Sequence, residues 1–188
     1  TAIKTLYTAT TTGLGNETIN VNDTAINAAD ANAINGYTTA KVTFSATSPT
    51  LSGLAADVKT FVLARTADIA GADDQLSIPL ATPITITDTG VVDAKTVDDT
   101  VNDTNFTGLV TIGSNATSLS GTLAIVTSVL DDDLAGTPKV DGSTALAITV
   151  TDTNITAAEQ AALDAKTTGA ITATISDTDA AELVKLTG

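Results

Sequence analysis

One short pattern occurs three times in this chain at nearly equal spacing. Apolar and polar residues alternate and lead into Asp-Thr in INVNDT (19–24), ITITDT (84–89) and ITVTDT (148–153). The first residues of these patterns are 65 and 64 positions apart. Each pattern is followed by a second alternating run (KVTFS, LVTIGS, AITATIS) and then by LSG, LSG and LTG. Three landmarks that recur in one order predict tandem structural repeats.

Each repeat predicts a strand, a helix, a second strand, a short turn and a second helix. Strands that alternate apolar residues with Thr are typical of sheets with one covered face. We therefore expect a mixed α/β fold of three tandem strand-helix-strand-helix repeats of about 60–65 residues, with the helices on one face of the sheets. The alternative is an all-β sandwich of short Thr-rich strands.

The first helix of a repeat is best defined in the third one. Thr156 followed by Glu159 predicts a capping box, and Asn27 and Asp30 take the same places in the first repeat. Glycine at 169 suits the position after the helix, and the helical spacing predicts a buried stripe. That stripe consists of Ile155, Ala158, Ala162 and Ala165. Second helices are expected over 54–64 and 122–130, and the helix of the second repeat is the least clearly indicated.

The repeat boundaries leave both ends unfinished. Repeats 1 and 2 cover 19–83 and 84–147, and repeat 3, at 148–188, stops after its LTG. The segment 1–18 resembles the helix that repeat 3 lacks. We expect it to complete that repeat in the next copy, or in the same giant chain, by head-to-tail contact. The predicted assembly interface consists of Ile3, Leu6, Tyr7, Leu183, Val184 and Leu186.

The charge balance restricts the partners. Eight basic residues face 22 acidic ones, for a net charge of −14, which excludes nucleic acid as a partner and disfavours an anionic membrane. No run of 18 apolar residues indicates membrane insertion. The chain has no His and no Cys, and no pair of carboxylates stands out locally. We therefore expect no enzyme activity and no required cofactor.

Recurring aspartates are the candidate metal ligands. Ca²⁺ prefers oxygen ligands, and repeat proteins recruit them from acidic loops. An Asp before Thr at a strand end also forms an Asx turn, and this alternative stays open. The candidate calcium ligands are Asp23, Asp88, Asp152, Asp131, Asp132 and Asp133.

The third repeat (148–188) and TLSGLAADVKTFV (50–62) resemble the tandem-repeat regions of very large surface-exposed proteins of marine cyanobacteria and other bacteria. The resemblance implies an extracellular structural or adhesive role, often with calcium. It transfers no catalytic residue.

These observations together predict a structural building block of an extracellular or cell-surface assembly, such as a filament, a sheath or a giant surface protein. Its partners would be copies of itself or adjacent repeats of the same chain. The alternative is an adhesin module that recognises glycans or another cell surface. Such a module would need a cleft or an aromatic platform. The aromatic residues available for a platform are Tyr7, Tyr37, Phe44, Phe61 and Phe106.

Overall fold

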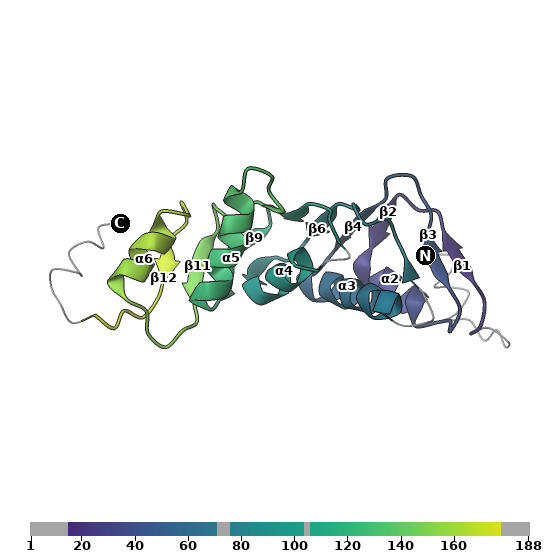
Figure 1. Ribbon diagram of the computed structural model, residues 1–188, viewed down its shortest axis with the longest axis horizontal. Helices are drawn as coiled ribbons and strands as arrows, with labels where there is room; N and C mark the ends of the chain where they lie inside the picture. Colours follow the sequence, from purple (N-terminus) through teal and green to yellow (C-terminus); the bar gives the residue numbers. More distant parts are fainter. Residues whose placement is uncertain (1–14, 71–75, 104–105, 178–188) are drawn as a thin grey trace.

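The computed structural model describes residues 15–70, 76–103 and 106–177, without the side chains of 66–70. The molecule is elongated, and the chain advances along its long axis from one end to the other (Figure 1). Five helices are described: α2 (Ala28–Asn35), α3 (Ala55–Ala70), α4 (Ala94–Val101), α5 (Leu123–Leu134) and α6 (Ala157–Asp164). Helices α2 to α5 form a row in which each contacts the next. None of the described helices is long and apolar enough to cross a bilayer.

The described strands form three sheets, and every described pairing is parallel. The first sheet has the order β1 (Ile19–Val21), β3 (Val42–Phe44), β5 (Leu76–Ser77). The second is β10 (Val140–Asp141), β8 (Val110–Ile112), β6 (Ile84–Ile86), β4 (Thr50–Gly53), β2 (Ala25–Asn27). The third is β12 (Ile171–Thr172), β11 (Ala147–Val150), β9 (Ala116–Gly121), β7 (Gly90–Asp93). The predicted mixed α/β fold is confirmed, and the all-β alternative is wrong.

Each repeat contributes strands to two sheets, and the next repeat continues the second of them. Strands β1, β3 and β5 of the first repeat form the first sheet, while β2 and β4 begin the second. That second sheet continues with β6, β8 and β10 of the second repeat, whose β7 and β9 begin the third. Strands β11 and β12 of the third repeat continue the third sheet, and its parallel bridge Ile155–Ile175 lies beyond that sheet. Sheets therefore run across the repeat boundaries and join the repeats.

The local sequence explains where the short helices begin. Asn27 precedes α2, and its side chain accepts a hydrogen bond from the backbone N–H of Asp30. Thr156 and Glu159 form the predicted capping box at α6. The less clearly indicated helix of the second repeat is α4, which Asp93 caps through the backbone N–H of Thr96.

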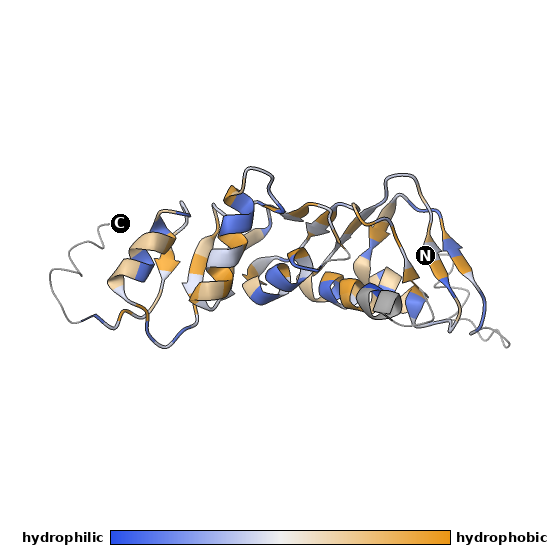
Figure 2. Ribbon diagram, viewed as in Figure 1, coloured by the Kyte–Doolittle hydropathy of each residue, from blue (hydrophilic) through white to orange (hydrophobic). Residues whose placement is uncertain are grey.

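Alternating strand residues face the core as predicted. Ile148 and Val150 of β11 are buried, and Thr149 between them is only half-buried. The largest buried side chains include Phe44 and Phe61, whose rings meet edge to face with centroids 5.6 Å apart. Figure 2 shows the same alternation of hydrophobic and hydrophilic residues along the ribbon.

Three sequence-based expectations are wrong in detail. Where a short turn was expected between the second strand and the second helix of repeats 1 and 2, the structure has a further strand, β4 or β9, which ends in the LSG triplet. In α6 the buried residues are Ala157 and Leu163, and the predicted stripe is exposed apart from Ile155. The C-cap of α6 is Ala165, so Gly169 lies beyond the helix end. The stripe failed because α6 spans only Ala157–Asp164, so Ile155 and Ala165 lie outside it, and its buried face passes through Ala157 and Leu163 instead.

Candidate functional site

The recurring Asp-Thr aspartates lie at the junctions between repeats. Asp88 follows β6, and its Oδ2 accepts a hydrogen bond of 2.6 Å from the backbone nitrogen of Ala55, the first residue of α3. Asp152 follows β11 and accepts from the backbone nitrogen of Leu123, the first residue of α5. In both cases the carboxylate belongs to one repeat and the helix to the repeat before it.

Asp177 forms the same kind of contact within repeat 3. Its carboxylate accepts a hydrogen bond from the backbone nitrogen of Ala157, the first residue of α6. The first amides of a helix have no partner inside the helix, and a negative charge there interacts favourably with the helix dipole. Thr122, the N-cap residue of α5, makes no side-chain cap hydrogen bond, so Asp152 provides that cap from the next repeat.

A pair of strands crosses each junction beside the capping aspartate. Leu51 of β4 lies opposite Ile84 of β6 in parallel register, and Leu119 of β9 lies opposite Ile148 of β11. The backbone continues these ladders by one hydrogen bond at each junction. Thr87 donates to the carbonyl of Gly53 and Thr151 to that of Gly121, both at 2.9 Å. Each junction thus combines a parallel strand pair with a helix cap in the same relative positions.

Asp23 holds the corresponding position after β1 but is unlike the other three aspartates. Asp88, Asp152 and Asp177 are half-buried, whereas Asp23 is exposed. Within the described ranges its side chain has no hydrogen-bond or ion-pair partner. Strand β1 pairs only with β3 among the described strands, and no described helix lies before it.

The acidic cluster at 131–133 does not converge on one point. Asp131 forms an ion pair with Lys166, and Asp132 lies 3.8 Å from Lys139. Asp133 accepts hydrogen bonds of 2.7 Å from both the backbone nitrogen and the hydroxyl of Ser143. Each of the three carboxylates therefore has a partner of its own.

The structure does not bring the six predicted calcium ligands together. Among the residues described, no group of three or more His, Cys, Asp or Glu side chains is placed to hold a metal ion. The described junction aspartates instead accept backbone N–H groups. Calcium binding stays a prediction for this chain.

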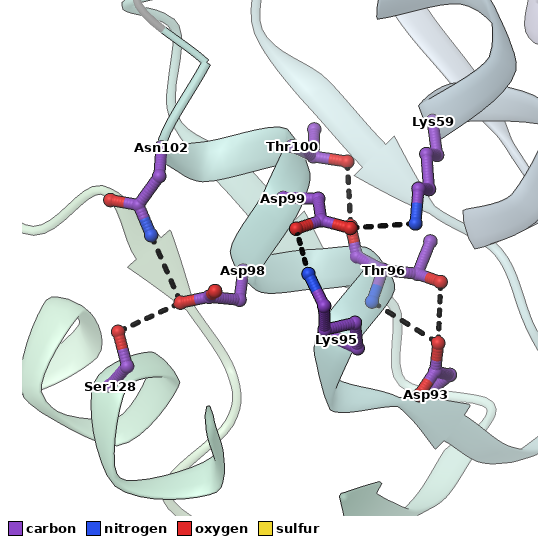
Figure 3. Close-up of polar contacts among 9 residues, drawn as sticks. All are labelled: Lys59, Asp93, Lys95, Thr96, Asp98, Asp99, Thr100, Asn102 and Ser128. Atoms are coloured by element: carbon purple, nitrogen blue, oxygen red, sulfur yellow. Dashed lines mark hydrogen bonds and ion pairs between the residues drawn. The ribbon is translucent and has the colours of Figure 1, made fainter. Parts of the chain in front are cut away.

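A charged cluster on α4 was not predicted from the sequence. Asp99 lies between Lys59 of α3, at 2.6 Å, and Lys95 of its own helix (Figure 3). The hydrogen bond from Lys59, followed by that from Lys95, holds the pKa of Asp99 below its usual range. Asp98 accepts from Ser128 of α5 at 2.8 Å, so the two aspartates link α4 to both neighbouring helices. The i,i+4 spacing of Lys95 and Asp99 could have indicated half of this cluster, but no local signal indicates Lys59.

Aromatic side chains do not form a platform in the described part of the chain. Phe44, Phe61 and Phe106 are buried, and the guanidinium of Arg65 lies 5.1 Å from the centre of the Phe106 ring. Tyr37 is half-buried. Tyr7 and the rest of the predicted assembly interface (Ile3, Leu6, Leu183, Val184, Leu186) lie outside the described residues.

A hollow of about 250 Å³ lies at the β1 end of the molecule. Apolar side chains of β1, β2 and α2 line it, together with the carboxylates of Asp23 and Asp30. The lining includes Val21, Ile26, Ala31, Ile34, Asp23 and Asp30.

Comparison with known proteins gives no match for this chain: no protein-family model, curated protein or solved structure shows significant similarity to it.

Proposed function

We propose that this protein is a structural building block of an extracellular assembly, in which copies or successive repeats associate head to tail. The observation that carries the proposal is the way the sheets run across the repeat boundaries. The second sheet takes two strands from repeat 1 and three from repeat 2, and the third sheet takes two described strands from repeat 2 and two from repeat 3. A unit that joins to the next in this way extends without a change in geometry.

The remaining surface supports a structural role. Two of the aspartates that recur in the sequence, Asp88 and Asp152, cap helix ends, and the described phenylalanines are in the core. A net charge of −14 with abundant Thr favours an extracellular location and solubility of the unassembled units. The adhesin alternative has no specific support among the described residues.

The proposal is tested by following the mass of the purified chain with concentration. We expect light scattering to show concentration-dependent polymers and electron microscopy to show unbranched filaments, because a head-to-tail contact that does not close forms a filament. A chain that stays monomeric at every concentration would overturn the proposal.

A deletion tests the part assigned to the amino-terminal segment. Removing 1–11 should abolish assembly while circular dichroism still shows folded protein. A full-length variant with Ile3, Leu6 and Tyr7 replaced by Ser is the matched control, because it keeps the length and removes only the apolar side chains. Polymers of the deletion variant as abundant as those of the parent would contradict this role.

A further inference from the structure

We propose that strand β1 and Asp23 form a docking edge for a second copy of this chain, whose Ile175 pairs in parallel with Ile19. The inference rests on the proposed function and specifies its contact. In the second copy, one side of Ile175 pairs with Ile155 of the same chain, and its opposite side is the edge that would pair with Ile19.

The two internal junctions supply the register. Leu51 pairs with Ile84 and Leu119 with Ile148, the first apolar residues of the second and third repeated patterns. Ile19 is the first apolar residue of the first pattern, and it has no such partner among the described strands. Ile175 pairs with Ile155 as Leu51 pairs with Ile26, so it holds the position that Leu51 and Leu119 hold in their repeats.

The backbone of β1 has the groups that this pairing needs. Ile19 donates its N–H to the carbonyl of Lys41, and Val21 accepts from the N–H of Ser45, so both residues direct their backbone toward β3. In a parallel ladder alternate residues face opposite neighbours, so Asn20 and Asn22 direct theirs to the other side. At the internal junctions Thr87 and Thr151, in the position of Asn22, donate across the boundary. An edge of this kind is a template for pairing with another chain.

Asp23 is the second element of the contact. At the internal junctions, Asp88 and Asp152 lie two residues after the paired strand and cap the helix of the preceding repeat. Asp23 lies two residues after β1 and is exposed. Asp23 therefore lies beside the edge of β1 as Asp88 and Asp152 lie beside β6 and β11.

The hollow beside Asp23 corresponds to the surface that helix α3 covers at the junction between repeats 1 and 2. Helix α3 contacts β6 and α4 there, and Ile86 of β6 and Val97 of α4 are fully buried. At the β1 end, Val21 lies two residues after Ile19 as Ile86 lies two after Ile84. Ala31 lies four residues after the N-cap Asn27 as Val97 lies four after the N-cap Asp93, and both Val21 and Ala31 line the hollow. The β1 end therefore repeats both the strand edge and the apolar surface on which a preceding repeat sits.

Cysteine cross-linking tests the register directly, because the chain contains no Cys. The register places Asn20 of one copy opposite Ser176 of the other, and both residues are exposed. Paired residues on adjacent strands are about 4.8 Å apart, within the range for a disulfide. A mixture of N20C and S176C proteins should therefore form a disulfide-linked heterodimer on mild oxidation, and N20C alone should not.

Two controls define the result. Ser52 and Thr85 are paired across the internal junction, so the double variant S52C/T85C should form its disulfide within one chain. N22C mixed with S176C shifts the register by two residues, to a separation of about 8 Å that a disulfide cannot bridge. Equal cross-linking of N22C and N20C, or none for N20C while the internal control reacts, would overturn the inference.

A second experiment tests Asp23 through assembly. D23A should reduce the mass-average polymer length at least threefold. D164A, which removes an exposed aspartate remote from the junctions, should leave the length unchanged. If the parent polymerises and D23A does so equally well, the inference fails and the proposed function stands; if the parent never polymerises, both fail.

Slow hydrogen exchange of the Asn20 and Asn22 amides in isolated monomers would show that the chain's own segment 1–14 covers the edge, and would also overturn the inference.

Discussion

At the scale of single residues, one aspartate position has one structural role. Asp88 and Asp152 both accept the N–H of a first helical residue from the preceding repeat, and Asp177 does the same inside repeat 3. From the sequence alone, the first two are candidate calcium ligands or Asx-turn residues. In each case the carboxylate accepts a backbone N–H that has no partner inside the helix.

We expect D152A to lower the free energy of unfolding by about 0.5–2 kcal/mol, the usual cost of losing an N-terminal helix cap. Leu123 would then lose the hydrogen bond to its backbone nitrogen, and Thr122 makes no replacement cap. Urea denaturation followed by circular dichroism measures the change. D23A is the matched control and should change the stability of the monomer by much less, because Asp23 has no described partner. An equal loss for both variants would contradict the role of Asp152.

At the scale of elements, the described strands have two to six residues, so each depends on its neighbours. Close backbone packing at the repeat boundaries is one consequence. Gly108 and Gly169 lie two residues before β8 and β12, and each runs against the backbone of a neighbouring strand entrance. A Cβ at Gly108 would lie 1.9 Å from the carbonyl oxygen of Thr82, and one at Gly169 would lie 1.8 Å from that of Leu146.

G108A should therefore destabilise the protein by about 1–3 kcal/mol, because the backbone must move to admit one methyl group. The midpoint of thermal or urea unfolding measures this loss. G136A is the control: no atom lies within 4 Å of its added Cβ, so we expect an unchanged or slightly higher stability. If both variants unfold at the same midpoint, the close approach at Gly108 has no energetic importance.

At the scale of the whole molecule, a row of helices and three offset parallel sheets carry a net charge of −14. Lysines neutralise part of this charge locally: Lys59 and Lys95 contact Asp99, and Lys166 contacts Asp131. With eight basic residues against 22 acidic ones, negative charge is in large excess over the chain. Self-repulsion of this kind opposes the folded state and the association of copies.

Divalent cations should relieve that repulsion. We expect millimolar Ca²⁺ to raise Tm relative to a chelator at the same ionic strength, with a larger effect on the assembled form than on monomers. Differential scanning calorimetry measures both, and NaCl of matched ionic strength separates screening from binding. An identical Tm in chelator and in millimolar Ca²⁺ would remove calcium from the account of this protein.

Local features of the fold can be predicted from the sequence. The spacing of Ile19, Ile84 and Ile148 marked the repeats, alternation marked the strands, and Thr156 with Glu159 marked the start of α6. These features follow from interactions within a few residues, such as the capping box and the period of a strand.

How these elements join depends on contacts between residues that are far apart in the sequence. The partner of Asp152 is 29 positions away and that of Asp88 is 33 away, and no local signal connects them. The pairing of Leu51 with Ile84 likewise depends on where the intervening helix α3 returns the chain. Alternating apolar and polar residues indicate that a strand has one buried face. They do not indicate which strand lies beside it, because the backbone hydrogen bonds along a strand edge are the same for any neighbouring strand. The choice of neighbour, and with it the sideways offset of the sheets, arises when the helices pack and bring distant strands side by side.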